Sequence, residues 1–188
     1  MFVQMIIRPP RSDYHDNLTG KSFELDGKNF KYESFEVANP KGEKLQCSMM
    51  EPATDEDRTG NEMPCIIYMH GNASNKMEGL QYAPLLAQHG LNLVTFDFSG
   101  CGKSQGDWVT LGHKEVHDLQ AVIEYIYENK RVSAIGLWGR SMGAATSLLY
   151  QAANPGTVNV MALDSGFSSL NDVINSMAGQ MGIPPEFV

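Results

Sequence analysis

The pattern Gly-x-Ser-x-Gly occurs twice in the sequence, and in each match the serine hydroxyl could act as a nucleophile. The two matches are Gly139–Gly143 and Gly102–Gly106. A nucleophilic serine of this kind lies on a tight turn between a buried strand and a helix, and small flanking residues keep that turn free of clashes. The segment before Ser141, SAIGLW, predicts a strand, and the segment after it, MGAATSLLYQAA, predicts a helix. Ser104 has neither neighbour, so we predict that Ser141 is the nucleophile and Ser104 a loop serine; the alternative for Ser141 is a serine that caps a tight turn.

Acyl transfer at a serine also needs hydrogen-bond donors for the oxyanion that develops on the substrate carbonyl. In this mechanism one donor is the backbone N–H of the residue after the serine, here Met142, and the second comes from the loop after the third strand. That loop is Met69–Ser74, which follows the apolar segment CIIYM, and Gly71 lets its backbone approach a substrate closely. A polar turn at the end of a strand is the alternative for His70-Gly71-Asn72. The presence of the serine turn elsewhere in the same sequence favours the interpretation of this segment as an oxyanion loop over that alternative.

A serine nucleophile needs a general base, and in this arrangement the chain order is serine, acid, histidine. The sequence has five histidines, and all of them precede Ser141. His113 and His117 lie four residues apart, as metal ligands on a helix sometimes do, but a solvated polar face is the favoured interpretation. Asp164 ends an apolar segment, and local hydrogen bonding at a turn is its favoured role. The sequence therefore predicts the nucleophile and the oxyanion loop without the base that would complete them.

Hydrophobic patterning predicts an α/β fold, in which a mostly parallel sheet carries helices on both faces. Short apolar segments indicate buried strands, and they alternate with amphipathic segments of helical period. Such alternation with short connections produces parallel strands joined by right-handed crossovers. A turn separates the first two predicted strands, and this pattern predicts an antiparallel hairpin. The predicted strands are Phe30–Val37, Leu45–Met50, Cys65–Met69, Leu91–Phe96, Ser133–Trp138 and Val158–Leu163, and the predicted helices are Gly79–His89, His113–Lys130, Met142–Ala153 and Ser168–Gly179.

The length and composition suit a single globular domain. The chain has 188 residues, of which 42% are hydrophobic and 19% charged, and this is enough to bury a core without disulfide or metal support. We expect an N-terminal arm over residues 1–29 and one incomplete domain over residues 30–188. Acidic residues outnumber basic ones by 22 to 14, and the net charge of −8 disfavours binding to nucleic acid.

Cysteine usage and hydropathy bear on the location of the protein. Three cysteines without a C-x-x-C spacing argue against a disulfide framework and a zinc site, and favour a reducing compartment. No segment approaches the roughly eighteen consecutive apolar residues of a membrane span. The N-terminal MFVQMII lacks the basic leader and the cleavage site of a signal peptide. We therefore expect a cytoplasmic protein without a transmembrane segment.

The ordered motifs resemble those of the α/β-hydrolase superfamily, in its serine-aminopeptidase-like (S33) branch. The motifs are His70-Gly71-Asn72, the segment from Asp97 to Ser104, Gly139–Gly143 and the segment from Leu163 to Phe167. The resemblance covers nearly the whole chain and implies an α/β-hydrolase fold. It also implies that Ser141 is the nucleophile, that the amides of Asn72 and Met142 form the oxyanion hole, that Gly71, Gly139 and Gly143 serve the turns, and that no metal or organic cofactor is used.

The sequence also departs from the family pattern in one respect. The acid and the histidine of the family follow later strands, whereas this sequence ends at Val188. We therefore expect a C-terminally truncated α/β-hydrolase whose last strands are missing and which is inactive as it stands. The whole protein would cleave an ester, thioester or amide of a small-molecule, acyl or peptidyl substrate through an acyl-Ser141 intermediate. The alternatives are a non-catalytic binding protein that lacks the base and a structural domain of a larger assembly. The coding sequence beyond Val188 distinguishes the enzyme from these two.

Overall fold

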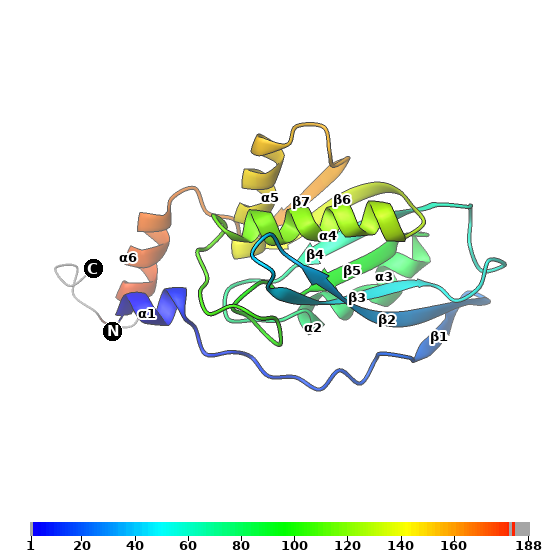
Figure 1. Ribbon diagram of the computed structural model, residues 1–188, viewed down its shortest axis with the longest axis horizontal. Coiled ribbons are helices and arrows are strands. Elements are labelled where there is room, and N and C mark those ends of the chain that lie inside the picture. The colour runs from blue at the N-terminus through cyan, green and yellow to red at the C-terminus, as the bar shows by residue number, and fades with distance from the viewer. Residues whose placement is uncertain (1, 181, 183–188) are drawn as a thin grey trace.

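The structure is a computed structural model that describes residues 2–180 and 182. A seven-stranded sheet forms its centre, with the strand order β1-β2-β3-β5-β4-β6-β7 (Figure 1). The strands are β1 (Ser22–Leu25), β2 (Lys28–Ala38), β3 (Lys44–Pro52), β4 (Met63–Met69), β5 (Asn92–Phe96), β6 (Val132–Arg140) and β7 (Val160–Asp164). The helices are α1 (Phe2–Ile7), α2 (Met77–Leu80), α3 (Ala83–Gln88), α4 (Glu115–Asn129), α5 (Met142–Ala153) and α6 (Leu170–Gln180).

The sheet is antiparallel at its N-terminal side and parallel around the predicted serine turn. β1, β2, β3 and β5 pair antiparallel in that order, whereas β5, β4, β6 and β7 run parallel. The predicted α/β fold and its N-terminal hairpin are confirmed. The described sheet is mixed because the β2–β3 hairpin joins the parallel strands through the antiparallel β3–β5 pair. β1, which the sequence pattern does not predict, extends this antiparallel part.

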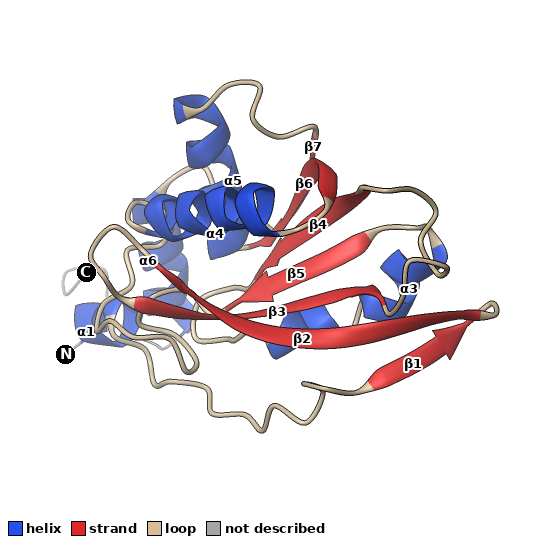
Figure 2. Ribbon diagram, turned by 45° about the vertical axis from the view of Figure 1, so that its right-hand side comes forward, coloured by secondary structure: helices blue, strands red, loops and turns tan. Residues whose placement is uncertain are grey.

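Helices cover both faces of the sheet, as predicted (Figure 2). α4 and α5 lie on one face, and α2 and α3 lie on the other. Alternate residues of a strand point to opposite faces, and β5 shows how two cores form in this way. Val94 and Phe96 pack in the core that includes Leu119 of α4, whereas Leu93 packs in the core that includes Leu86 of α3.

The helix predicted over Gly79–His89 is interrupted in the structure. α2 ends at Leu80, and α3 begins at Ala83 with a proline in its first turn. Pro84 has no N–H to donate to the carbonyl of Leu80, so one continuous helix would lose that hydrogen bond and clash with the ring. The end of the pair agrees with the prediction, since Gly90 adopts a positive φ of 69° after α3.

Residues 1–29, predicted as an arm, contain regular structure in the part that is described. α1 begins at Phe2, and β1 extends the sheet beside β2. The segment between them runs along the lower side of the molecule in Figure 1. The division of the chain at residue 29 stays a prediction. None of the helices in the described part is long and apolar enough to cross a membrane.

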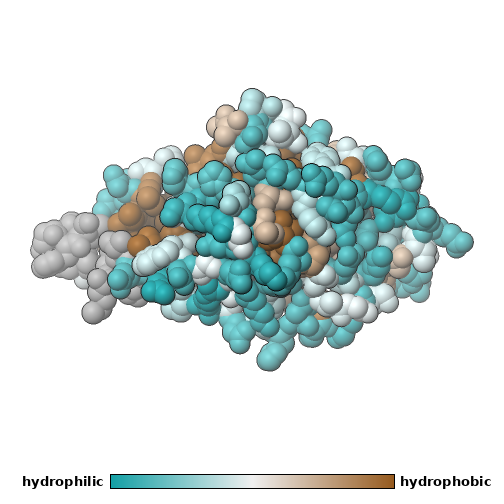
Figure 3. Space-filling view, viewed as in Figure 1, coloured by the Kyte–Doolittle hydropathy of each residue, from teal (hydrophilic) through white to brown (hydrophobic). Residues whose placement is uncertain are grey.

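β7 forms one edge of the described sheet. It pairs only with β6 among the described strands, and Val160 and Leu163 are 59% and 41% exposed. Hydrophobic side chains also reach the surface of α5 and the start of α6: Leu148, Leu149 and Leu170 are 46%, 47% and 44% exposed. Figure 3 shows hydrophobic residues at the surface in this region.

Candidate active site

Ser141 lies on a strained turn between β6 and α5, as the sequence predicts. Its φ of 52° and ψ of −108° are unusual for a residue with a side chain. The Ser141 N–H donates to the carbonyl oxygen of Asp164 over 2.8 Å, which ties the turn to the end of β7. A side chain on Gly139 would collide with the backbone of Gly143 and lie 2.5 Å from the Ala144 nitrogen. Only glycine therefore fits at this position of the turn.

The predicted oxyanion loop is a tight turn directly after β4. Ala73 has a positive φ of 60°, and the Ser74 N–H donates to the carbonyl of Gly71 over 3.3 Å. The side-chain Oδ1 of Asn72 accepts a hydrogen bond of 2.9 Å from the Ala73 N–H. This side-chain bond is a typical way for asparagine to stabilise a turn.

His70 fixes the orientation of the peptide between Gly71 and Asn72. The ring is fully buried, and its Nε2 accepts a hydrogen bond of 3.2 Å from the Phe98 N–H. The ring proton therefore lies on Nδ1, which donates to the Gly71 carbonyl over 2.7 Å. In a trans peptide the N–H points away from the carbonyl. The Asn72 N–H is thus directed away from His70.

The two predicted oxyanion donors belong to segments that touch each other. A Cβ on Gly143 would lie 2.7 Å from the Met69 Cβ, so the first turn of α5 packs against the end of β4. A Cβ on Gly71 would lie 2.7 Å from Nη2 of Arg140. Among the residues that the structure describes, neither the Asn72 N–H nor the Met142 N–H has a hydrogen-bond partner within the protein. Two free amide donors therefore lie on the two segments that meet at the serine turn.

An ion pair joins the serine turn to α2. Arg140 donates from Nε and Nη2 to the carboxylate of Glu78 over 2.5 and 2.6 Å. Tyr68 and Ser74 donate their hydroxyls to the same carboxylate over 2.7 and 2.5 Å. Burial alone would raise the pKa of Glu78, but the hydrogen bonds from Arg140, Ser74 and Tyr68 outweigh it and lower that pKa to about 2. Glu78 is therefore an anion that holds the loop and the turn together.

No general base for Ser141 is found among residues 2–180 and 182. The Ser141 hydroxyl has no hydrogen-bond partner in that part of the chain. His70 does not serve as one, since burial lowers its pKa and both ring nitrogens are already bonded. The Asp164 carboxylate accepts from the Ser165 hydroxyl over 2.7 Å, in line with the local role predicted for it.

Ser104 is a structural serine, as predicted. It is 1% exposed, and its hydroxyl donates to the Asp97 carbonyl over 2.6 Å and accepts from the Gln46 N–H over 2.8 Å. The Asp97 carboxylate accepts from the backbone N–H groups of Lys76 and Lys103 over 2.6 and 2.8 Å. Both side chains therefore shape the loop after β5.

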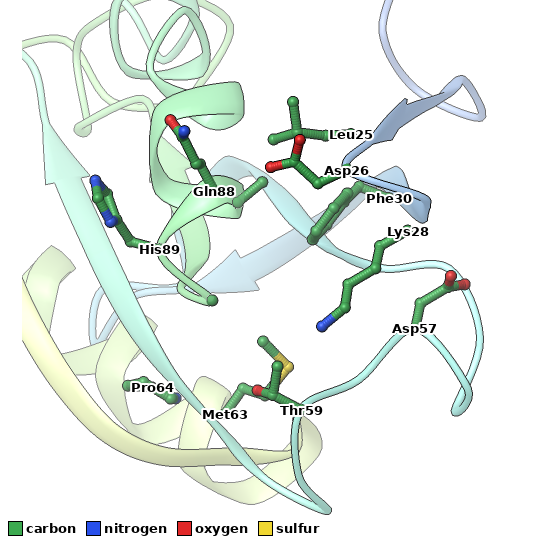
Figure 4. A pocket seen from close by; sticks show the side chains of 12 residues that line it. Leu25, Asp26, Lys28, Phe30, Asp57, Thr59, Met63, Pro64, Gln88 and His89 are labelled. Carbon is green, nitrogen blue, oxygen red and sulfur yellow. The ribbon is translucent and has the colours of Figure 1, made fainter.

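A hollow of about 540 Å³ lies at the opposite end of the sheet from Ser141. It is bordered by the β1–β2 turn, the start of β4 and the end of α3 (Figure 4). Lys28 extends into it, and Phe30 and Met63 form part of its wall. Met63 and Met69 are the two ends of β4, and only Met69 lies beside the serine turn. This hollow is not part of the candidate site.

A smaller hollow of about 380 Å³ adjoins the helix that follows Ser141. Its lining is mainly apolar and comes from the loop before α4, from α5 and from the segment before α6. The residues are Thr110, Leu111, His113, Ala145, Leu148, Leu149, Phe167, Ser168 and Leu170. Within the described residues, no group of three or more His, Cys, Asp or Glu side chains is arranged to hold a metal ion.

The sequence interpretation missed the residues that support the site. It gave no role to Glu78 and none to the side chain of His70, and it left Ile6 in the arm, although the Asn72 Nδ2 donates to the Ile6 carbonyl over 3.1 Å. The serine motif contains Arg140 but assigns no role to it. These contacts join positions about 60 residues apart, so no local pattern signals them.

Solved structures share this fold. An esterase from Pyrococcus furiosus, Pf2001, superposes with a TM-score of 0.73 and 25% identity, and the match covers 97% of this chain and 64% of that one. Est1E from Butyrivibrio proteoclasticus, solved with ferulic acid, superposes with a TM-score of 0.58 and 22% identity, over 68% of this chain and 50% of that one. The fold is therefore that of the α/β-hydrolases.

Curated relatives match over part of their length. Protein bem46 of Schizosaccharomyces pombe is 30% identical over 114 residues, which is 59% of this chain and 38% of that protein. The lysophosphatidylserine lipase ABHD12 of Gallus gallus is 29% identical over 126 residues, which is 64% of this chain and 32% of that protein. The chain thus spans about a third of the length of these relatives.

A family model identifies the chain most directly. The model of the X-Pro dipeptidyl-peptidase (S15) family matches residues 41–184, which is most of the sequence. This match does not confirm the S33-like branch expected from the motifs, which stays a prediction. The chain belongs to the X-Pro dipeptidyl-peptidase (S15) family, within the α/β-hydrolase superfamily.

Proposed function

We propose that the protein is a serine hydrolase that cleaves an ester, thioester or amide bond through an acyl-Ser141 intermediate. One observation carries the proposal. Ser141 occupies a strained turn, its hydroxyl is free among the described residues, and the unpaired N–H groups of Met142 and Asn72 lie on the adjoining segments. A capping serine would need neither the strain nor the two free amides.

The proposed reaction has two steps. In the first, Ser141 Oγ forms a bond to the substrate carbonyl carbon while its proton passes to a base, and the carbonyl electron pair moves onto oxygen. The N–H groups of Asn72 and Met142 stabilise this oxyanion. The leaving alcohol, thiol or amine departs with the proton, and in the second step water releases the acid and restores the serine hydroxyl.

We assign the base and the acid that orients it to residues beyond Val188. Two observations support this assignment. No described histidine contacts the Ser141 hydroxyl, and bem46 and ABHD12 are about three times as long as the matched regions, which cover 38% and 32% of them. The names of two similar proteins, an esterase and a lysophosphatidylserine lipase, support an ester as the substrate class.

A non-catalytic binding protein is the second candidate. The same lack of a described base favours it, because a serine without a base has only the reactivity of an ordinary alcohol. Such a protein would use the pocket without forming an acyl-enzyme.

Trapping of the acyl-enzyme distinguishes the two candidates. We expect the protein expressed from its complete coding sequence to hydrolyse a p-nitrophenyl ester and, after rapid acid quenching, to carry the acyl mass on the peptide that contains Ser141. Ser141→Ala should lose both signals, whereas Ser104→Ala, if it folds, should keep the acyl mass on Ser141. If the wild type shows no turnover and no acyl adduct, the result supports the binding protein.

A further inference from the structure

The C-terminal end of α1 binds the oxyanion loop. The Ile6 carbonyl accepts a hydrogen bond of 3.1 Å from Nδ2 of Asn72, and the Ile6 side chain is only 3% exposed. The oxygen of the same side-chain amide, Asn72 Oδ1, accepts a hydrogen bond of 2.9 Å from the Ala73 N–H. The side chain of Asn72 is therefore held at both ends, once by its own loop and once by the N-terminal segment.

The same end of α1 also binds the loop that follows β5. The carbonyl of Ile7, the next residue, accepts a hydrogen bond of 2.7 Å from the Val109 N–H. The Arg8 guanidinium lies 5.1 Å from the centre of the Trp108 ring and 3.7 Å from the Asp107 carboxylate. Two consecutive carbonyls thus connect the loops after β4 and β5.

Further contacts hold the following residues in place. The Arg11 guanidinium donates to carbonyl oxygens of the loop after β5, those of Gly102, Ser104 and Gly106. The Tyr14 hydroxyl donates to the Asp97 carboxylate over 2.8 Å, and Nζ of the buried Lys76 donates to Asp16 over 2.9 Å. These hydrogen bonds hold the segment between Arg11 and Asp16 in position on the loops after β4 and β5.

We infer that Ile6 and Ile7 position the oxyanion hole, and that the N-terminal segment is part of the catalytic architecture through Asn72. The inference rests on the proposed function. Oxyanion donors act only within a narrow range of distances, about 2.7–3.1 Å from the developing charge, and the loss of one donor costs about 10²–10³ in rate. A segment that holds the Asn72 side chain also limits the movement of the Asn72 N–H.

The test compares two changes that remove the same contact from opposite sides. Deletion of residues 2–8 removes the Ile6 carbonyl and leaves Arg11, Tyr14 and Asp16 in place. Asn72→Ser keeps the backbone N–H and a hydroxyl that can bond the Ala73 N–H, but it is too short to reach Ile6. Ile126→Val, a change in the core beneath α4 where Ile126 is fully buried, controls for loss of stability alone. All variants are made in the protein expressed from its complete coding sequence.

Two readouts report on the oxyanion hole. The first is the rate at which a fluorophosphonate modifies Ser141, with the serine O–P bond formed, fluoride expelled and the serine proton lost. The second is the ³¹P chemical shift of the adduct, whose phosphoryl oxygen occupies the oxyanion hole. We expect the deletion and Asn72→Ser each to slow labelling about tenfold or more and to shift the ³¹P resonance, and their combination to add little to either alone. Ile126→Val should change neither readout, although its melting temperature falls by an amount comparable to that of the two test variants.

Labelling and a ³¹P shift that match the wild type in both variants would overturn the inference while leaving the proposed function intact. A wild type that is not labelled at Ser141 would instead refute the proposed function. Hydrogen exchange supplies a measurement that does not depend on labelling. The peptide covering residues 70–76 should exchange faster after the deletion, and the peptide covering residues 132–140 should not; unchanged exchange at residues 70–76 would also overturn the inference.

Discussion

Arg140 and Glu78 form a two-bond ion pair, with Arg140 Nε and Nη2 lying 2.5 and 2.6 Å from the two carboxylate oxygens of Glu78. The pair connects the residue before Ser141 to α2. Since the guanidinium also packs against Gly71 and Glu78 accepts from Ser74, the pair contacts both ends of the oxyanion loop. The serine turn and the predicted oxyanion loop are thereby held as one unit.

Replacement of Arg140 should loosen this unit. We expect Arg140→Met to lower the free energy of unfolding by about 1–2 kcal/mol, because it removes two charge-assisted hydrogen bonds from a partly exposed pair. Urea denaturation measures the change. Lys44→Met is the matched control, since its ion pair with Glu36 is about half exposed and should contribute less than the Arg140 pair. Equal losses in the two variants would contradict a special role for the Arg140 pair.

The same pair predicts a dependence of stability on pH. The pKa of Glu78 lies at about 2 in the folded protein, below its ordinary value of 4.5. Its stabilising contribution is therefore complete above about pH 4.5 and is lost as the pH falls toward 2, because the unfolded chain binds the proton first. The free energy of unfolding should fall less between pH 5 and pH 3 in Glu78→Gln than in the wild type. Parallel curves for the two proteins would show that Glu78 contributes nothing to this dependence.

A methyl group at Gly143 should disturb the serine turn directly. The added Cβ would overlap the Met69 carbonyl and lie 2.7 Å from the Met69 Cβ. We expect Gly143→Ala to cost about 2 kcal/mol or more of stability, as overpacking at a backbone contact does. Gly179→Ala is the control, since no atom lies within 4 Å of its Cβ and alanine favours the helix. A Gly143→Ala variant as stable as Gly179→Ala would mean that α5 is not packed on β4 as described.

The serine turn was predictable because its requirements are local. A strand, two glycines, a serine and a helix follow one another within the segment, and α5 occupies the predicted range Met142–Ala153. The hairpin and the parallel strands were predictable for a similar reason, since each carries its own hydrophobic pattern. The roles assigned to Ser141, Asn72 and Met142 remain predictions that the fold accommodates.

The supporting contacts were not predictable because they are non-local. Nothing near Arg140 indicates that Glu78, 62 residues away, is its partner. Nothing in MFVQMII indicates that the Ile6 carbonyl meets Asn72, 66 residues away. Such contacts depend on which strands become neighbours, and strand order is a property of the whole sheet.

The open edge at β7 should promote self-association of the 188-residue chain. Val160 is 59% exposed, and VNVMAL has no charge or proline that would block pairing with another strand. Light scattering after size-exclusion chromatography should show oligomers that increase with concentration, and Val160→Lys should reduce them. Glu124→Gln on the exposed face of α4 changes the net charge by the same single unit and controls for it. A wild-type chain that stays a 20.7 kDa monomer at every concentration would contradict this expectation.

Activity-based labelling tests the central claim most directly. The protein expressed from its complete coding sequence is treated with a fluorophosphonate, and the modified peptide is identified by mass spectrometry. We expect one adduct, on Ser141, that is abolished by Ser141→Ala. We expect the 188-residue chain alone, in whose described part no base is found, to react about a thousandfold more slowly. Modification of Ser104, or no modification of Ser141 in a folded protein, would contradict the assignment of Ser141 as the nucleophile.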